Sequence, residues 1–180
     1  MRKMILAAGM LLAAALLSGR ELQVNGNFRK INKTTNTPGA WSTEAKKDTV
    51  ETKVLPGRNP GMNAFQIRTR KEVCYYAGPQ DVEKGEKITF SADVKGKGKV
   101  FLQLNFFGSG GSGFAGSRCV AAADAAEQWS RIAGSCLVEG EFNGKPVRTV
   151  RPAFGAEAGS EVTFENIRIA VSRDTQPERK

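Results

Sequence analysis

The alternation of apolar and polar residues is the feature that most constrains how this chain can fold. After residue 20 no segment carries a sustained helical period, and the recurring pattern has period two, broken by Gly, Pro, Asn and Lys. Strands are predicted over residues 64–70, 88–94, 100–107, 129–137, 147–154 and 161–171. About eight or more short strands with frequent turn signals predict an all-β fold, an antiparallel β-sandwich of the jelly-roll type.

Local signals refine this prediction at three places. The run 95–99, Lys-Gly-Lys-Gly-Lys, predicts a turn that joins its two flanking strands into an antiparallel hairpin. The alanine-rich stretch 121–128 is the only helix-like segment and predicts one helical turn. In the last strand the apolar parity changes near Glu165-Asn166, so one β-bulge there would keep both apolar sets on the core face.

The first nineteen residues are typical of a leader for export. Arg2 and Lys3 precede an unbroken apolar run from Met4 to Leu17, which is short for a membrane span of about 20 residues. An uncleaved anchor helix is the alternative. We therefore expect a signal peptide over 1–19, a single domain over 20–171 with no integral membrane span, and a polar tail over 172–180. The expected location is secreted, periplasmic or in the cell envelope.

Composition excludes several kinds of chemistry. The chain has no histidine, which removes Ser-His-Asp and Cys-His catalysis and the commonest transition-metal ligand. No two carboxylates can be placed across a cleft, as glycoside hydrolysis requires, so no enzyme activity is expected. The net charge is +9, or +7 after Arg2 and Lys3 are subtracted (9 − 2), but the basic residues are interleaved with acidic ones. This favours a solvated surface over a nucleic-acid site and is compatible with an acidic glycan.

Two further motifs have ordinary interpretations. Residues 108–113 match the dinucleotide pattern G-x-G-x-x-G, but a strand-like segment follows instead of the helix that would hold a pyrophosphate. We interpret them as a loop between two strands. In an exported protein two of the three cysteines can form a disulfide, which leaves one over; Cys119 and Cys136 flank one predicted turn and are the favoured pair, although sequence alone does not decide the pairing.

Five segments in this order carry a resemblance to a known family: 24–28 (Val-Asn-Gly-Asn-Phe), 38–41 (Pro-Gly-Ala-Trp), 82–96, 129–131 and 162–169. Together they resemble the carbohydrate-binding modules of the family 4/9/22 type, which are β-sandwiches with a galactose-binding-like fold. The resemblance covers nearly all of the chain after the leader. Because this fold is also found in modules that bind no sugar, the function it implies rests on analogy.

The resemblance implies that a polysaccharide or oligosaccharide binds on the concave sheet. Sugar rings stack their C–H faces on aromatic rings, and their hydroxyls need directional donors and acceptors. In the strand from Val100, the residues Val100, Leu102, Leu104 and Phe106 are expected in the core, and the opposite parity carries mixed amide and aromatic side chains. The sugar-binding residues expected on these grounds are Trp41, Tyr75, Tyr76, Gln103, Asn105, Phe107 and Arg151. Alternation puts only one of the two tyrosines outward, and Trp41 is open to either burial or stacking.

Modules of this kind often hold a structural calcium, which is disfavoured here. Arg29 follows Phe28, and Glu165-Asn166 replaces the expected acidic pair, whereas a hard cation needs several oxygen ligands. No cofactor and no metal are therefore expected. The alternative function is an envelope or extracellular assembly protein that uses the same sandwich to contact a protein partner. A weak hydrolase or hydrolase accessory is a third hypothesis.

Overall fold

The computed structural model describes residues 19–34, 37–46, 48–109 and 113–173. The predicted leader, except for Gly19, lies outside these residues, as does the predicted tail beyond Arg173. Fifteen strands are found in the described part: β1 (Arg20–Glu21), β2 (Ile31–Asn32), β3 (Thr37–Pro38), β4 (Trp41–Ser42), β5 (Val50–Pro56), β6 (Asn63–Thr69), β7 (Val73–Ala77), β8 (Gln80–Asp81), β9 (Glu86–Phe107), β10 (Phe114–Ala125), β11 (Ser130–Leu137), β12 (Glu141–Phe142), β13 (Lys145–Pro146), β14 (Thr149–Ala156) and β15 (Glu161–Arg173).

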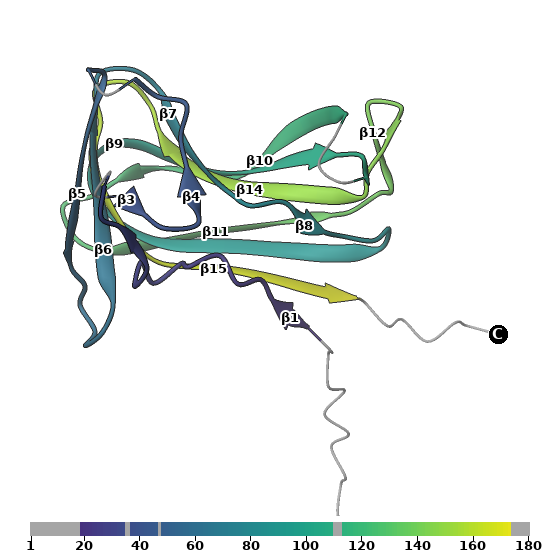
Figure 1. Ribbon diagram of the computed structural model, residues 1–180, viewed down its shortest axis with the longest axis horizontal. Coiled ribbons are helices and arrows are strands. Elements are labelled where there is room, and N and C mark those ends of the chain that lie inside the picture. The colour runs from purple at the N-terminus through teal and green to yellow at the C-terminus, as the bar shows by residue number, and fades with distance from the viewer. Residues whose placement is uncertain (1–18, 35–36, 47, 110–112, 174–180) are drawn as a thin grey trace, which may run out of the picture.

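The strands form two layers of one curled antiparallel sheet, which confirms the predicted β-sandwich (Figure 1). Layer 1 has the order β5-β6-β15-β9-β11, with β1 pairing with β15. Layer 2 has the order β4-β7-β14-β9-β10, with β8 also pairing with β14. Two short hairpins, β2-β3 and β12-β13, lie outside this sheet. The described residues contain no helix long and apolar enough to cross a membrane.

β9 belongs to both layers, so the predicted hairpin at residues 95–99 is wrong. Its first half pairs with β11 and β15, and its second half pairs with β10 and β14. Gly96 and Gly98 have φ angles of 130° and 110°, so the strand bends there without reversing. A Cβ on Gly96 would lie 2.2 Å from the Glu161 carbonyl oxygen. Gly96 is therefore needed for close contact with β15 and Gly98 for close contact with Ser160, just before that strand, and neither forms a turn.

Two other local predictions have different outcomes. The predicted helical turn at 121–128 is wrong, because residues up to Ala125 continue β10 in pairing with β9. Ladder hydrogen bonds and the packing of Ala121, Ala123 and Ala125 against the core override the helix propensity of alanine. The β-bulge is confirmed: the β15–β9 register shifts between Glu165 and Arg168, and Asn166 has a φ of 52°.

The core lies between the two layers, as the alternation predicts. Val100, Leu102, Leu104 and Phe106 are all at most 2 % exposed. The centre is an aromatic cluster around Phe154, whose ring lies within 6.4 Å, between centroids, of its neighbours Phe28, Trp41, Phe65, Tyr75 and Phe164. Offset and edge contacts of this kind add to the free energy gained from burial alone.

The N-terminal motif of residues 25–28 closes the sandwich against its last strand. Gly26 accepts a hydrogen bond from the Ile167 amide, and a Cβ on Gly26 would overlap the Ile167 carbonyl. The Asn25 amide donates to the Gly39 carbonyl, which connects the motif to the segment that precedes Trp41. The motif that carried the family resemblance is therefore a structural device, and none of these contacts involves the predicted sugar-binding face.

Candidate functional site

The candidate site is the outer face of layer 2, which we define by six side chains that point away from the core: Tyr76, Phe101, Gln103, Asn105, Phe107 and Arg151. The register places them in adjacent rows. Arg151 pairs with Asn105, and Ala153 of β14 pairs with both Gln103 and Tyr76. From Phe101 to Phe107 the face extends about 20 Å along β9.

Arg151 is the cationic centre of this face. Its Nε donates to the Ala77 carbonyl at 3.0 Å, and one terminal nitrogen donates to the Ser42 hydroxyl at 2.9 Å. The guanidinium lies 4.8 Å from the Tyr76 ring centroid, within cation–π range. Arg151 forms no ion pair with any residue that the structure describes. It is thus oriented by neutral partners, and the nearest acidic influence on this part of the face is Glu44, which acts on Tyr76 without forming an ion pair with Arg151.

The two amides of β9 have different roles. Gln103 Nε2 donates to Asn105 Oδ1 at 2.8 Å, and Asn105 Nδ2 donates to the Arg151 carbonyl at 3.1 Å. Asn105 is only 5 % exposed, whereas Gln103 is half-buried. The arrangement leaves Gln103 as the amide that faces solvent and Asn105 as the residue that fixes its orientation.

Aromatic rings lie at both ends of the face. At one end Phe107 packs against Phe114 with centroids 5.4 Å apart, and Phe114 is 53 % exposed. At the other end Phe101 leans over Gly155, where a Cβ would lie 2.5 Å from the ring. Phe101 and Phe114 were not among the predicted site residues. Phe101 shares the parity of Gln103, which is the signal that could have found it.

Trp41 and Tyr75 do not lie on this face, so their assignment to it is wrong. Both pack against Phe154 in the core: Trp41 edge-on at 4.8 Å and Tyr75 stacked at 5.6 Å. They are 6 % and 1 % exposed. Alternation along β7 puts Tyr76 outward and Tyr75 inward, as expected for the pair. Burial raises the pKa of the Tyr76 hydroxyl to about 12, with the neighbouring Cys74 adding to the shift.

The three cysteines are free thiols, so the structure lacks the predicted Cys119–Cys136 bond. Cys119 is exposed on β10, where its position pairs with Gln103. Cys136 is buried and lies 3.4 Å from a terminal nitrogen of Arg118. Because neighbouring residues of a strand point to opposite faces, Cys119 points away from the side on which Arg118 meets Cys136.

The residues that the resemblance would assign to a calcium do not fit one. Arg29 Nε donates to the Gly61 carbonyl at 2.5 Å, so a guanidinium occupies the position after Phe28. Glu165 is fully buried, and its two oxygens accept from the backbone amide and from Nε of Arg58, at 3.2 and 3.1 Å. Guanidinium groups thus supply the positive charge at both positions.

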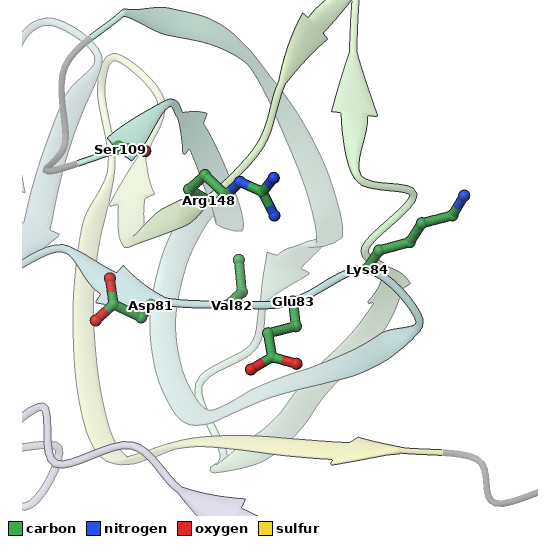
Figure 2. Close-up of a pocket in the computed structure, with 6 residues that line it drawn as sticks. All are labelled: Asp81, Val82, Glu83, Lys84, Ser109 and Arg148. Carbon is green, nitrogen blue, oxygen red and sulfur yellow. The ribbon is translucent and has the colours of Figure 1, made fainter.

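A hollow at one end of the sandwich has a volume of about 520 Å³ and is lined by Asp81, Val82, Glu83, Lys84, Ser109 and Arg148; Figure 2 shows how these side chains lie. Acidic and basic side chains are equally represented, and Glu83 is engaged by Arg173. The mixed charges and the open position give this hollow no selectivity for a ligand of one sign. It adjoins the Phe107 end of the outer face, since the Arg148 amide donates to the Phe107 carbonyl, but none of the six residues lines it.

No protein-family model and no curated protein sequence matches the chain. Solved structures do. The CBM22-1–GH10 xylanase 10B of Clostridium thermocellum, complexed with xylohexaose, matches with 14 % identity over 72 % of this chain and a TM-score of 0.52. The chain spans only 26 % of that protein. The CBM22-2 xylan-binding domain from Paenibacillus barcinonensis matches with 11 % identity, 74 % of this chain, 92 % of that domain and a TM-score of 0.54.

A protein with a different activity has the same architecture. A Stig cyclase from Fischerella sp. TAU matches with 12 % identity, 87 % of this chain, 99 % of that chain and a TM-score of 0.62. Identities this low show the fold and leave the function open. The chain therefore has the β-sandwich fold of the family 22 carbohydrate-binding modules, a fold that it also shares with Stig cyclases.

Proposed function

We propose that this protein is an exported, non-catalytic glycan-binding module that holds a sugar chain along the outer face of layer 2. The observation that carries the proposal is Arg151, which forms no ion pair among the described residues and stacks on Tyr76 beside Gln103, on a face with aromatic rings at both ends. The fold is compatible with this function, since two of the similar structures are a xylanase bound to xylohexaose and a xylan-binding domain.

Each side chain has a defined part in this proposal. Phe107 and Phe114 offer apolar surface to the C–H faces of sugar rings, and Gln103 offers a donor and an acceptor to hydroxyls. Arg151 forms charge-assisted hydrogen bonds with the ligand, which are about twice as strong as neutral ones. Because Arg151 has no acidic partner in the described residues, the preferred glycan carries carboxylates, as uronic acid units do.

The test is binding of the full chain to neutral xylan, glucuronoxylan and polygalacturonate, measured by affinity electrophoresis and calorimetry at low and moderate salt. Arg151→Ala should lower the affinity for the acidic chains about tenfold or more, since a hydrogen bond to a charged group contributes about 1.5–3 kcal/mol. Arg168→Ala is the matched control, because it removes an equal charge from layer 1, where Arg168 Nε donates to Asn166 Oδ1.

The double variant Gln103→Ala, Phe107→Ala should weaken binding to neutral and acidic chains alike. If both arginine variants lose equal affinity and all binding disappears at moderate salt, the attraction comes from net charge and the proposed site is wrong. Unchanged binding by the double variant would place the ligand elsewhere on the molecule.

A contact surface for another protein is the second candidate. The observation that favours it is the exposure of Phe114 and Leu137, each 53 % exposed, on two neighbouring strands at the side of the sandwich. Sedimentation of the full chain over a range of concentrations tests it. An oligomer that dissociates in Phe114→Ser and Leu137→Ser, and that glycans leave unchanged, would favour this function over glycan binding.

A further inference from the structure

A second hollow lies at the side edge of the sandwich, where the two layers come together. It is lined by β5 of layer 1, by β4 and β7 of layer 2 and by the β2-β3 hairpin, which lies beside β5 at the left of Figure 1. Its volume is about 550 Å³, within the range of about 300–1,000 Å³ that is usual for small-ligand sites. Trp41 and Tyr75, which are excluded from the outer face of layer 2, both form part of its wall.

The indole of Trp41 has an unsatisfied hydrogen-bond donor. Its Nε1 is buried and has no hydrogen-bond partner, and it is the one side-chain nitrogen or oxygen in that state among the described residues. A buried donor without a partner costs about 1–3 kcal/mol, and native proteins contain few of them. Phe154 packs edge-on against the same ring, and Trp41 also lines the hollow. The nitrogen is covered in this structure, so an acceptor from the hollow would reach it after a small movement of the wall and would then remove this cost.

The wall of the hollow indicates the chemistry of that acceptor. It carries hydroxyl groups from both layers and from the connecting segment, among them Thr34, Ser42, Thr43 and Thr52, beside the two aromatic residues. No charged side chain lines it among the described residues. Hydroxyl groups beside aromatic surface suit a molecule with apolar C–H faces and its own hydroxyls. The absence of charge disfavours an ionised ligand, which would lose its hydration without compensation.

We propose that this hollow is a second binding site, separate from the outer face of layer 2, for one neutral hydroxylated ring of monosaccharide size, with Trp41 Nε1 donating to a ligand oxygen. The two sites adjoin at Ser42, which lines the hollow and accepts a hydrogen bond from Arg151. The proposal stands independently of glycan binding on the outer face, and it goes beyond that function.

The two tryptophans of the chain make a direct test practicable. In the ¹⁵N-labelled full-length protein, Trp129→Phe assigns the Trp41 indole resonance. If that variant does not fold, the assignment comes from the nuclear Overhauser effect to Phe154, whose ring centroid is 4.8 Å from that of Trp41. D-xylose, D-glucose and D-galactose are the neutral probes, D-galacturonate is the charged probe, and open-chain sorbitol reports on bulk polyol effects.

We expect at least one neutral sugar to shift the Trp41 indole resonance saturably, with a dissociation constant of about 1 mM or weaker. Galacturonate and sorbitol should bind less well. Thr52→Val removes a hydroxyl from the wall with little change in shape and should weaken binding several-fold. Thr89→Val is the matched control, because Thr89 is exposed on β9 in layer 1.

Three results would overturn the proposal. The first is a Trp41 resonance that no neutral sugar moves, which would leave ordered water as the partner of the indole. The second is an equal response to sorbitol, which would mean a solvent effect. The third is loss of the response in the Gln103→Ala, Phe107→Ala variant, which would assign the sugar to the outer face. Polysaccharide binding by the Gln103→Ala, Phe107→Ala variant tests only the proposed function on the outer face. The proposed function and the second binding site can therefore fail separately.

Discussion

Replacing Arg58 with alanine should destabilise the protein by about 3 kcal/mol, within the range measured when one partner of a buried ion pair is removed. Glu165 is fully buried, while the Arg58 side chain is 42 % exposed. Arg58→Ala removes the 3.1 Å bond from Nε to Glu165 and leaves only the backbone amide on the other carboxylate oxygen. It also removes the contact with Asp93, which still pairs with Arg131, and the stacking of the guanidinium on Trp129. Most of the effect is therefore the cost of an uncompensated buried carboxylate.

Urea unfolding followed by Trp fluorescence measures this loss, and calorimetry should show a melting temperature lower by about 6–12 °C. Arg68→Ala is the control, because Arg68 forms the same kind of pair with Glu161 at 2.9 Å but with side chains 60 % and 47 % exposed. It should cost less than about 1 kcal/mol. Adding Glu165→Gln to Arg58→Ala should recover part of the loss, since the buried charge is then gone. Equal, small losses in both arginine variants would refute the argument from burial.

Three further predictions follow from other features. Gly96→Ala should lower the free energy of unfolding in urea by about 2 kcal/mol or more. Gly144→Ala is the control, because Gly144 also has a positive φ but has open space around its Cβ position, and it should lower that free energy by only about 1 kcal/mol. Equal losses would contradict the close contact with β15. Ellman's reagent on the native protein should show one fast thiol that Cys119→Ser removes, whereas a protein without a fast thiol would contain the disulfide that the structure lacks. Burial raises the pKa of the Cys74 thiol from 9.0 to about 11, so the folded protein holds this proton more tightly than the unfolded chain does. The stability of the protein should therefore fall as the pH rises from 9 to 11. Under reducing conditions Cys74→Ala should flatten that part of the stability profile, and an unchanged slope would show that the thiol is not responsible.

The fold follows from the sequence where residues alternate cleanly. The strand from Val100 is assigned to the correct face throughout, and the β-bulge at Glu165-Asn166 is located correctly because the apolar parity changes there. The error at residues 95–99 has a physical origin. Glycine at positive φ is compatible with a turn, a bulge or a bend in a continuous strand, and only the pairing partners on both sides decide among them.

The candidate site was predictable in part for the same reason. Gln103, Phe107 and Arg151 come together because parity and antiparallel register are local rules, and alternation also places one tyrosine of the pair outward. Burial of Trp41 depends on Phe154, more than a hundred residues away in the chain. The pairing of Glu165 with Arg58 likewise joins distant segments. No local pattern reports such contacts.

The position of β15 has a consequence for synthesis of the chain. Among the described residues it is the last strand in chain order, yet it lies inside layer 1 between β9 and β6. Until residues 161–173 have left the ribosome, both of those neighbours carry unpaired backbone groups and the core lacks Val162, Phe164 and Ile169. The core of a chain with this topology therefore cannot close before β15 has been made.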